Sequence, residues 1–464
     1  MSKSPEALGL PNVRLFLAFR LLFTSRFYYP VFTILFLDYG LTLEQFSLLN
    51  VLWAVTIVLA EVPSGALADI VGRRRLVVAA AFLMLVELAT IGFVPLGNPD
   101  LVLGAFVINR ICSGLAEAAA SGADEALAYD SIVEAGYEDQ WPQVLESLGK
   151  LTSIGMFLAM MTGALVYDRQ VMGTILEALG FGEVLGPKTL VRVPVLMTFC
   201  TGCFAFLAAW RLKEVGATLE RPNLGSIRVA FSQVLGTGRW IVTSAPFVLV
   251  VILAGLALDS VARQFALLSS EYFRQISIPT VLLGPISAGA ALLGIVSAKV
   301  SRRMAESCRP LTNFVILTAF LCGGLVGIGF GIPYWGVLFA LVPFLTMSSI
   351  GFLQSHYLNR AVDSSRRATA LSFKGLALNV GMGLASVLYA GLLRGLEAGG
   401  LSKEATFFPG LRWFAPYVGV LALGVLLAGL WLLRGTQGPP VDSSEEDAEA
   451  DPAAEPGVPP LSQA

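Results

Sequence analysis

The chain has 464 residues, of which 55% are hydrophobic and only 14% charged, and its formal net charge is −2. Soluble domains carry about 25% charged residues because water must solvate their surface, so this composition excludes a soluble globular protein. The near-neutral net charge gives no indication of nucleic-acid binding. Because charged residues are few, we expect most of the exterior to contact the lipid bilayer.

Apolar segments along the chain predict an all-α polytopic membrane protein with twelve transmembrane helices in two pseudo-symmetric six-helix bundles. A spanning helix needs about 20 apolar residues, whereas barrel strands would alternate apolar and polar residues over about 10. The first six helices are predicted at residues 13–37, 44–69, 75–96, 100–128, 143–166 and 190–211. The second six are predicted at residues 246–270, 279–300, 309–332, 334–358, 369–394 and 411–434.

These helices divide the chain into four regions. Residues 1–211 are the N-terminal bundle, residues 212–245 a cytoplasmic linker with an amphipathic helix, and residues 246–434 the C-terminal bundle. Residues 435–464 are rich in Pro, Ala, Glu and Asp and predict a disordered acidic cytoplasmic tail. Most loop Lys and Arg residues fall on one side of the membrane, so we expect both termini in the cytoplasm and the protein in the cell (inner) membrane.

The end of the second predicted helix carries a polar motif, Gly65-x-x-x-Asp69-x-x-Gly72-Arg73-Arg74. Its glycine, small residue and double arginine recur at the same spacing at the end of the eighth helix, in residues 294–303. This repeat favours two homologous halves with a site between them.

The motif resembles the signature loop of the Major Facilitator Superfamily, although Ile70 stands where that family usually has Arg or Lys. The segments Arg110-x-x-Ser113-Gly114 and 366–369 are similar to further segments of that family. The resemblance implies a transporter whose helices 1, 4, 7 and 10 line a central cavity. It also implies that Arg110 takes part in proton coupling.

The signature loop is predicted to act as a conformational latch. Gly72 permits a tight turn, and Asp69 is placed to accept hydrogen bonds from the positive N-terminus of a neighbouring helix. The resemblance implies that Arg73 pairs with Asp130. The latch set is therefore Gly65, Asp69, Gly72, Arg73 and Asp130. The alternative is that the basic residues only fix the membrane topology.

Several charged residues lie inside predicted helices, where each costs at least about 2.5–3.5 kcal/mol unless it faces water or a partner. We predict a substrate and ion site formed by Arg26, Arg110, Glu117, Asp259 and Arg263. Glu117 is the candidate proton carrier, because burial and the nearby arginine affect its protonation in opposite directions. Asp259 and Arg263 are four residues apart and can pair along one helix, which also permits a purely structural role.

These features predict a monomeric secondary active transporter that moves a small solute by alternating access, coupled to H+, with efflux favoured. A metabolite uptake symporter is the alternative. A non-transporting receptor is disfavoured because the outer loop 167–189 and the tail are too small for a folded domain. No catalytic residues, metal site or cofactor are expected, since the chain has neither a phosphate-binding glycine loop nor a metalloprotease motif.

Overall fold

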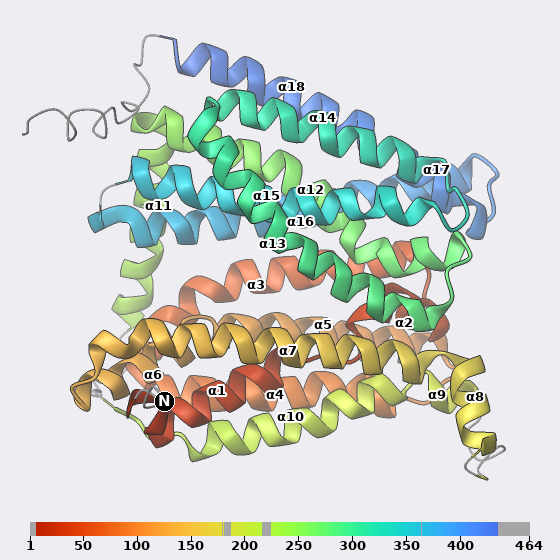
Figure 1. Ribbon diagram of the computed structural model, residues 1–464, viewed down its shortest axis with the longest axis horizontal. Coiled ribbons are helices and arrows are strands. Elements are labelled where there is room, and N and C mark those ends of the chain that lie inside the picture. Colours follow the sequence, from red (N-terminus) through yellow and green to blue (C-terminus); the bar gives the residue numbers. More distant parts are fainter. Residues whose placement is uncertain (1–5, 179, 181–186, 216–223, 363, 435–464) are drawn as a thin grey trace, which may run out of the picture.

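The computed structural model describes residues 6–178, 180, 187–215, 224–362 and 364–434. All the regular elements in these ranges are helices. They form two bundles that lie one above the other in Figure 1, with α1 to α10 in the lower bundle and α12 to α18 in the upper one. The residues of the predicted tail, 435–464, lie outside the described ranges.

The N-terminal bundle begins with two short helices in place of one span. Its helices are α1 (Pro11–Thr24), α2 (Phe32–Asp38), α3 (Leu43–Val71), α4 (Arg73–Phe93), α5 (Pro99–Ala120), α6 (Ala123–Glu134), α7 (Trp141–Tyr167), α8 (Arg169–Ala178), α9 (Pro187–Leu190) and α10 (Val193–Arg211). Short 3-10 turns lie at Glu6–Gly9, Tyr29–Val31 and Glu138–Gln140.

A further helix, α11 (Leu224–Ser244), packs against α3 and α16 and connects the two bundles. The C-terminal bundle contains α12 (Pro246–Gln275), α13 (Leu283–Ser307), α14 (Pro310–Gly329), α15 (Gly336–Ala361), α16 (Ser364–Ala398), α17 (Phe407–Arg412) and α18 (Phe414–Leu432). Two 3-10 turns, Thr280–Leu282 and Glu404–Thr406, precede α13 and α17.

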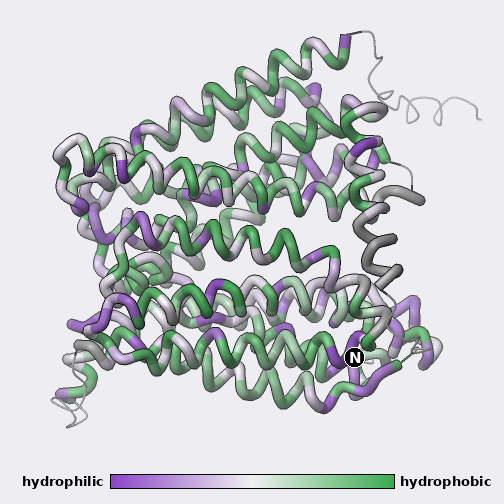
Figure 2. Tube along the Cα trace, turned by 180° about the vertical axis from the view of Figure 1, so that it is seen from behind, coloured by the Kyte–Doolittle hydropathy of each residue, from purple (hydrophilic) through white to green (hydrophobic). Residues whose placement is uncertain are grey.

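Eleven of the described helical segments are long and apolar enough to cross a membrane. The hydrophobic colour follows the lengths of the helices in Figure 2 and the hydrophilic colour concentrates towards their ends, as expected for a bundle in lipid. The predicted all-helical membrane fold is therefore confirmed. The missing twelfth segment is the first, because α1 and α2 are each too short to be counted alone.

Two of the predicted spans are not continuous helices, so the prediction of unbroken helices there was wrong. The predicted helix 13–37 breaks between Thr24 and Phe32, and the predicted helix 100–128 breaks at Ser121 and Gly122, where the glycine has φ = 77°. Glycine adopts this left-handed conformation without the steric cost that a Cβ atom brings. The predicted polar face of the fourth span is therefore divided between α5 and α6, which are two separate helices.

The membrane-spanning helices define two faces of the molecule. We call the end at which α1 begins and α18 ends the terminal face, and the end at which α2 and α12 end the loop face. Helix α7 packs against α13 of the other bundle, where a Cβ atom on Gly284 would lie 2.7 Å from the carbonyl oxygen of Met160. This close approach holds the two bundles together along α7.

Candidate functional site

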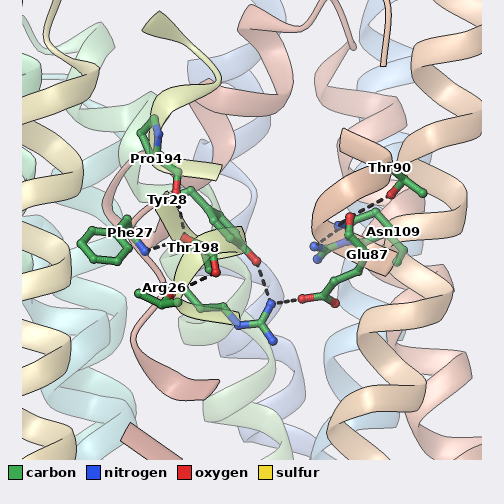
Figure 3. A network of polar contacts seen from close by, with 10 residues as sticks. Arg26, Phe27, Tyr28, Glu87, Thr90, Asn109, Pro194 and Thr198 are labelled. Atoms are coloured by element: carbon green, nitrogen blue, oxygen red, sulfur yellow. Dashed lines mark hydrogen bonds and ion pairs between the residues drawn. The ribbon is translucent and has the colours of Figure 1, made fainter. Parts of the chain in front are cut away.

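The break between α1 and α2 holds a buried ion pair, shown in Figure 3. The Arg26 guanidinium lies between two partners: it forms an ion pair with Glu87 of α4 and donates a hydrogen bond of 2.9 Å to the Tyr28 hydroxyl. Arg26 is 4% exposed and Glu87 is fully buried. Removal of either charge would leave the other unpaired in a low-dielectric interior and so would destabilise the bundle.

Polar groups of α5 and α10 complete this network. Asn109 donates a hydrogen bond of 2.8 Å to the backbone carbonyl of Glu87, and the backbone N–H of Phe27 donates one of 3.1 Å to the Thr198 hydroxyl. Backbone groups freed by a helix break inside a membrane must find partners within the protein. Thr198 supplies one of these partners.

Arg110 of α5 lies in the same region; its charge interacts with that of Glu87, but no ion pair of Arg110 is present among the described residues. Its Nε and Nη2 atoms donate to the Asn109 side-chain oxygen at 3.0 and 2.9 Å. Its guanidinium lies over the rings of Phe32 and Phe36, 5.2 and 5.3 Å from their centroids. Cation–π contacts of this kind offset part of the cost of burying the charge.

Glu117 lies near the end of α5, two turns from Arg110, and is exposed. No ion pair of Glu117 is present among the described residues, and its charge interacts with Glu61 of α3 and with Tyr29. Gly114, on the predicted polar face, packs against Thr56 of α3. Part of that face is therefore a helix–helix contact, while Glu117 remains accessible.

Asp259 and Arg263 form an ion pair of 2.8 Å along α12. Asp259 is 5% exposed, and its charge also interacts with Lys374 of α16. The charges of Arg26, Arg110 and Glu117 all interact with Tyr29, whereas Asp259 and Arg263 pair with each other on α12. Arg26 and Arg110 lie in the interior of the N-terminal bundle, Glu117 is exposed beside Glu61, and the Asp259–Arg263 pair belongs to the other bundle.

The signature loop lies between α3 and α4 at the terminal face. Arg73 forms an ion pair with Asp130 of α6, and Gly72 has φ = 100°. A Cβ atom would meet nothing within 4 Å at Gly65, so close packing does not require a glycine there. The Asp69 side chain, also part of the predicted latch, lies outside the described residues.

Glu214, which the sequence did not single out, caps the first turn of α4. Its carboxylate oxygens accept hydrogen bonds from the backbone N–H groups of Arg73 and Arg74, at 3.0 and 3.1 Å. A Cβ atom on Gly72 would lie 2.7 Å from Glu214 Oε2. A carboxylate at this position is stabilised by the positive end of the helix, and the glycine gives it room.

A second group that sequence reasoning missed connects the two bundles at the loop face. The two carboxylate oxygens of Asp38, the last residue of α2, accept hydrogen bonds from Arg274 of α12 at 2.7 Å and from the Tyr167 hydroxyl at 2.8 Å. Arg274 also donates to Glu271 at 2.8 Å. Nothing local marks these residues, because charges at helix ends are common in any membrane protein.

Further cross-bundle contacts lie at the same face. The Ser270 hydroxyl accepts a hydrogen bond of 3.0 Å from the Thr33 backbone N–H, and Asp168 accepts one of 3.0 Å from the Val281 backbone N–H. Arg394 of α16 forms an ion pair with Glu44 of α3. The polar contacts described between the bundles thus gather at the loop face.

Metal ligands do not cluster in the part of the chain that the structure describes: no group of three His, Cys, Asp or Glu side chains there could hold an ion. The five cysteines, Cys112, Cys200, Cys203, Cys308 and Cys322, are free thiols.

Comparison with known proteins gives a family and a fold. A family model described as the Major Facilitator Superfamily matches residues 15–386. The nucleoside transporter NupG is similar in structure, with a TM-score of 0.64 and 13% identity over 91% of this chain and 98% of that one. No curated protein matches the chain by sequence.

Two other solved structures have the same fold. A bacterial homologue of the human lysosomal transporter Spinster, in an inward-facing and unoccupied conformation, gives a TM-score of 0.65 with 13% identity, over 94% of this chain and 100% of that one. The D-xylose-proton symporter gives 0.59 with 13% identity, over 92% of this chain and 96% of that one.

Proposed function

The chain belongs to the Major Facilitator Superfamily of transporters, and we propose that it moves a small solute by alternating access as a secondary active transporter. The two bundles are the moving parts, and a site between them faces one side of the membrane at a time. This mechanism requires contacts between the bundles that form on one side and break when the site opens to that side.

The polar contacts around Asp38 and Arg274 are the observation that carries this proposal. They join α2 and α7 of one bundle to α12 of the other at the loop face. We place the terminal face in the cytoplasm, because exposed arginines such as Arg75, Arg302 and Arg309 lie there. On this orientation the loop face is the outer gate, it is closed, and the described conformation is inward-facing.

Glu117 is the proposed proton carrier. It is exposed on α5, has no described ion pair, and lies close enough to Glu61 for the two charges to interact. An accessible carboxyl group without a counter-ion can take up and release a proton. A proton taken up there would couple the solute to a pH gradient.

The other predicted site residues have different proposed roles. The charged pair Asp259–Arg263 on α12, with Lys374 nearby, is the proposed contact for a polar group of the solute. Arg26 belongs to the buried structural pair with Glu87. Arg110 is the proposed orienting group, because no ion pair occupies its guanidinium among the described residues.

We propose efflux as the direction to test first, in a monomer in the cell (inner) membrane with both termini in the cytoplasm. Proton-coupled uptake is the second candidate, and the likeness to the D-xylose-proton symporter supports it. The latch role of Arg73 with Asp130 is also a proposal. It rests on their ion pair at the terminal face, which would hold α4 against α6 in this conformation.

Electrical recording on proteoliposomes tests the proposal. A panel of small solutes is applied with and without an imposed pH gradient, and we expect one solute class to give a current that the gradient drives. In Glu117→Gln we expect that pH-driven current to be lost while exchange of the solute itself is retained. A current that does not depend on pH in the parent protein would reject proton coupling, and no current with any solute would argue against transport.

A further inference from the structure

An apolar cavity lies inside the C-terminal bundle at its terminal-face end. The space at this site, about 490 Å³ with the open solvent at its mouth, lies between α12, α14, α15 and Leu433, the residue after α18. Its walls are formed mostly by aliphatic and aromatic side chains, among them Phe247, Val251, Phe314, Ile350 and Leu353. The proposed transport site uses none of these residues.

The helices that border this cavity on one side also face lipid. Ile316 and Phe320 of α14 are 45% and 44% exposed, and Leu427 and Trp431 of α18 are 59% and 70% exposed. The two helices pack against each other, and Figure 1 shows α18 beside α14. Large exposed apolar side chains on a spanning helix contact acyl chains, so the cavity lies directly behind the lipid boundary.

One polar atom of the cavity wall has no partner among the described residues. It belongs to Asn313, which lies in the first turn of α14, lines the cavity and is 1% exposed. The Asn313 amide nitrogen donates to the carbonyl oxygen of Met304 at 2.8 Å and to the Tyr357 hydroxyl at 2.7 Å. Its side-chain oxygen has no hydrogen-bond partner, and a buried acceptor without a donor is costly.

Positive charge surrounds the same end of the bundle. Arg309 immediately precedes α14, Arg434 follows α18 closely, and Arg360 lies in the last turn of α15; all three are exposed. No ion pair is described for any of these arginines. The carboxylate nearest to Arg309 along the chain, Glu306, is already paired with Arg302 at 3.6 Å.

We propose that this cavity binds part of one acyl chain of an anionic phospholipid. The phosphate then lies against Arg309 and Arg434, and a headgroup hydroxyl can donate to the free oxygen of Asn313. Basic pockets between transmembrane helices recognise anionic headgroups in this way, and the apolar walls match the acyl chain. The cavity belongs to the C-terminal bundle alone, so lipid binding there does not depend on the solute, direction or coupling of transport.

The experiment titrates the full-length protein, purified in a neutral detergent, with phosphatidylglycerol and follows thermal unfolding and native mass spectrometry. We expect phosphatidylglycerol to bind and stabilise the protein, and phosphatidylcholine and inorganic phosphate to have little effect. Each arginine near a membrane surface adds to the attraction for anionic lipid. Loss of two of them in R309Q/R434Q should therefore weaken phosphatidylglycerol binding about thirtyfold. Ala254→Leu, which adds volume to the cavity wall, should also weaken it.

The matched control is R75Q/R211Q, which removes two exposed arginines from the same face of the other bundle and should leave the affinity unchanged. Equal stabilisation by phosphatidylcholine, or equal phosphatidylglycerol affinity in R309Q/R434Q, would overturn the proposal. A chain truncated after Arg434 tests the acidic tail as the occupant. If phosphatidylglycerol binds only after truncation, the tail and not a lipid occupies the cavity in the full-length chain, and the proposal is wrong.

Discussion

Asp38→Asn should shift the protein away from the conformation described here. The substitution keeps the shape of the side chain but removes the charge that holds Arg274 at 2.7 Å. A hydrogen bond to a charged group contributes about 1.5–3 kcal/mol when buried, and an exposed ion pair contributes about 0.2–1 kcal/mol. Here the Asp38 side chain is 22% exposed and that of Arg274 38%, so the contact lies between these limits.

We therefore expect a loss of about 1–2 kcal/mol, which changes the ratio of closed to open outer gate by roughly 5- to 30-fold. Spin labels at Asp100 and Tyr334, both exposed on the loop face of opposite bundles, report this ratio as a distance distribution. The longer distance should gain population in Asp38→Asn. Glu146→Gln breaks an ion pair with Lys150 within α7 and should change nothing. If both variants give the parent distribution, Asp38 does not hold the gate.

Three further substitutions test the packing around the site, each by thermal unfolding followed through tryptophan fluorescence. Glu87→Gln leaves Arg26 as an uncompensated buried charge, so we expect a loss of about 3–5 kcal/mol; a change under about 1 kcal/mol would mean that water reaches the pair. Gly163→Ala drives a methyl group into the backbone carbonyl of Phe27, in the turn after α1. It should lower the free energy of unfolding by about 1–3 kcal/mol or more. Gly173→Ala, where a Cβ atom meets nothing within 4 Å, is its control and should be neutral or stabilising. Glu214→Gln removes the charge that caps α4 and should lower the free energy of unfolding by about 0.3–1 kcal/mol. An equal loss at high salt would mean that a hydrogen bond, and not the charge, stabilises the helix end.

Hydropathy was sufficient to predict the approximate position and the type of eleven of the twelve predicted spanning helices. Each of these depends on about 20 consecutive residues and on the thickness of the bilayer, which are local properties. The break after α1 was missed because it depends on distant partners, whereas the break in the fourth predicted span lies at Gly122, a local feature. The turn after α1 is stabilised by the Arg26–Glu87 pair and by Thr198, and neither partner is visible in the sequence around residue 25.

The site was predicted less completely than the fold. The Asp259–Arg263 pair could be expected, since four residues separate its members on one helix. The ion pair between Asp38 and Arg274 could not, because 236 residues separate them and each alone is an ordinary charge at a helix end. Glu214 was missed for the same reason, as its partners are backbone groups 140 and 141 residues away.

The accessibility of residue 117 from each side of the membrane tests alternating access without knowledge of the solute. The chain would carry Glu117→Cys, with the five native cysteines replaced by serine, and a second form would add D38C/R274C. In sided vesicles treated with a membrane-impermeant thiol reagent, we expect Cys at 117 to react from both sides. Once oxidation links positions 38 and 274, the cysteine at position 117 should react only from the terminal face. Reduction of the link should restore its reaction from the loop face. Continued reaction from the loop face with the link closed would contradict the account.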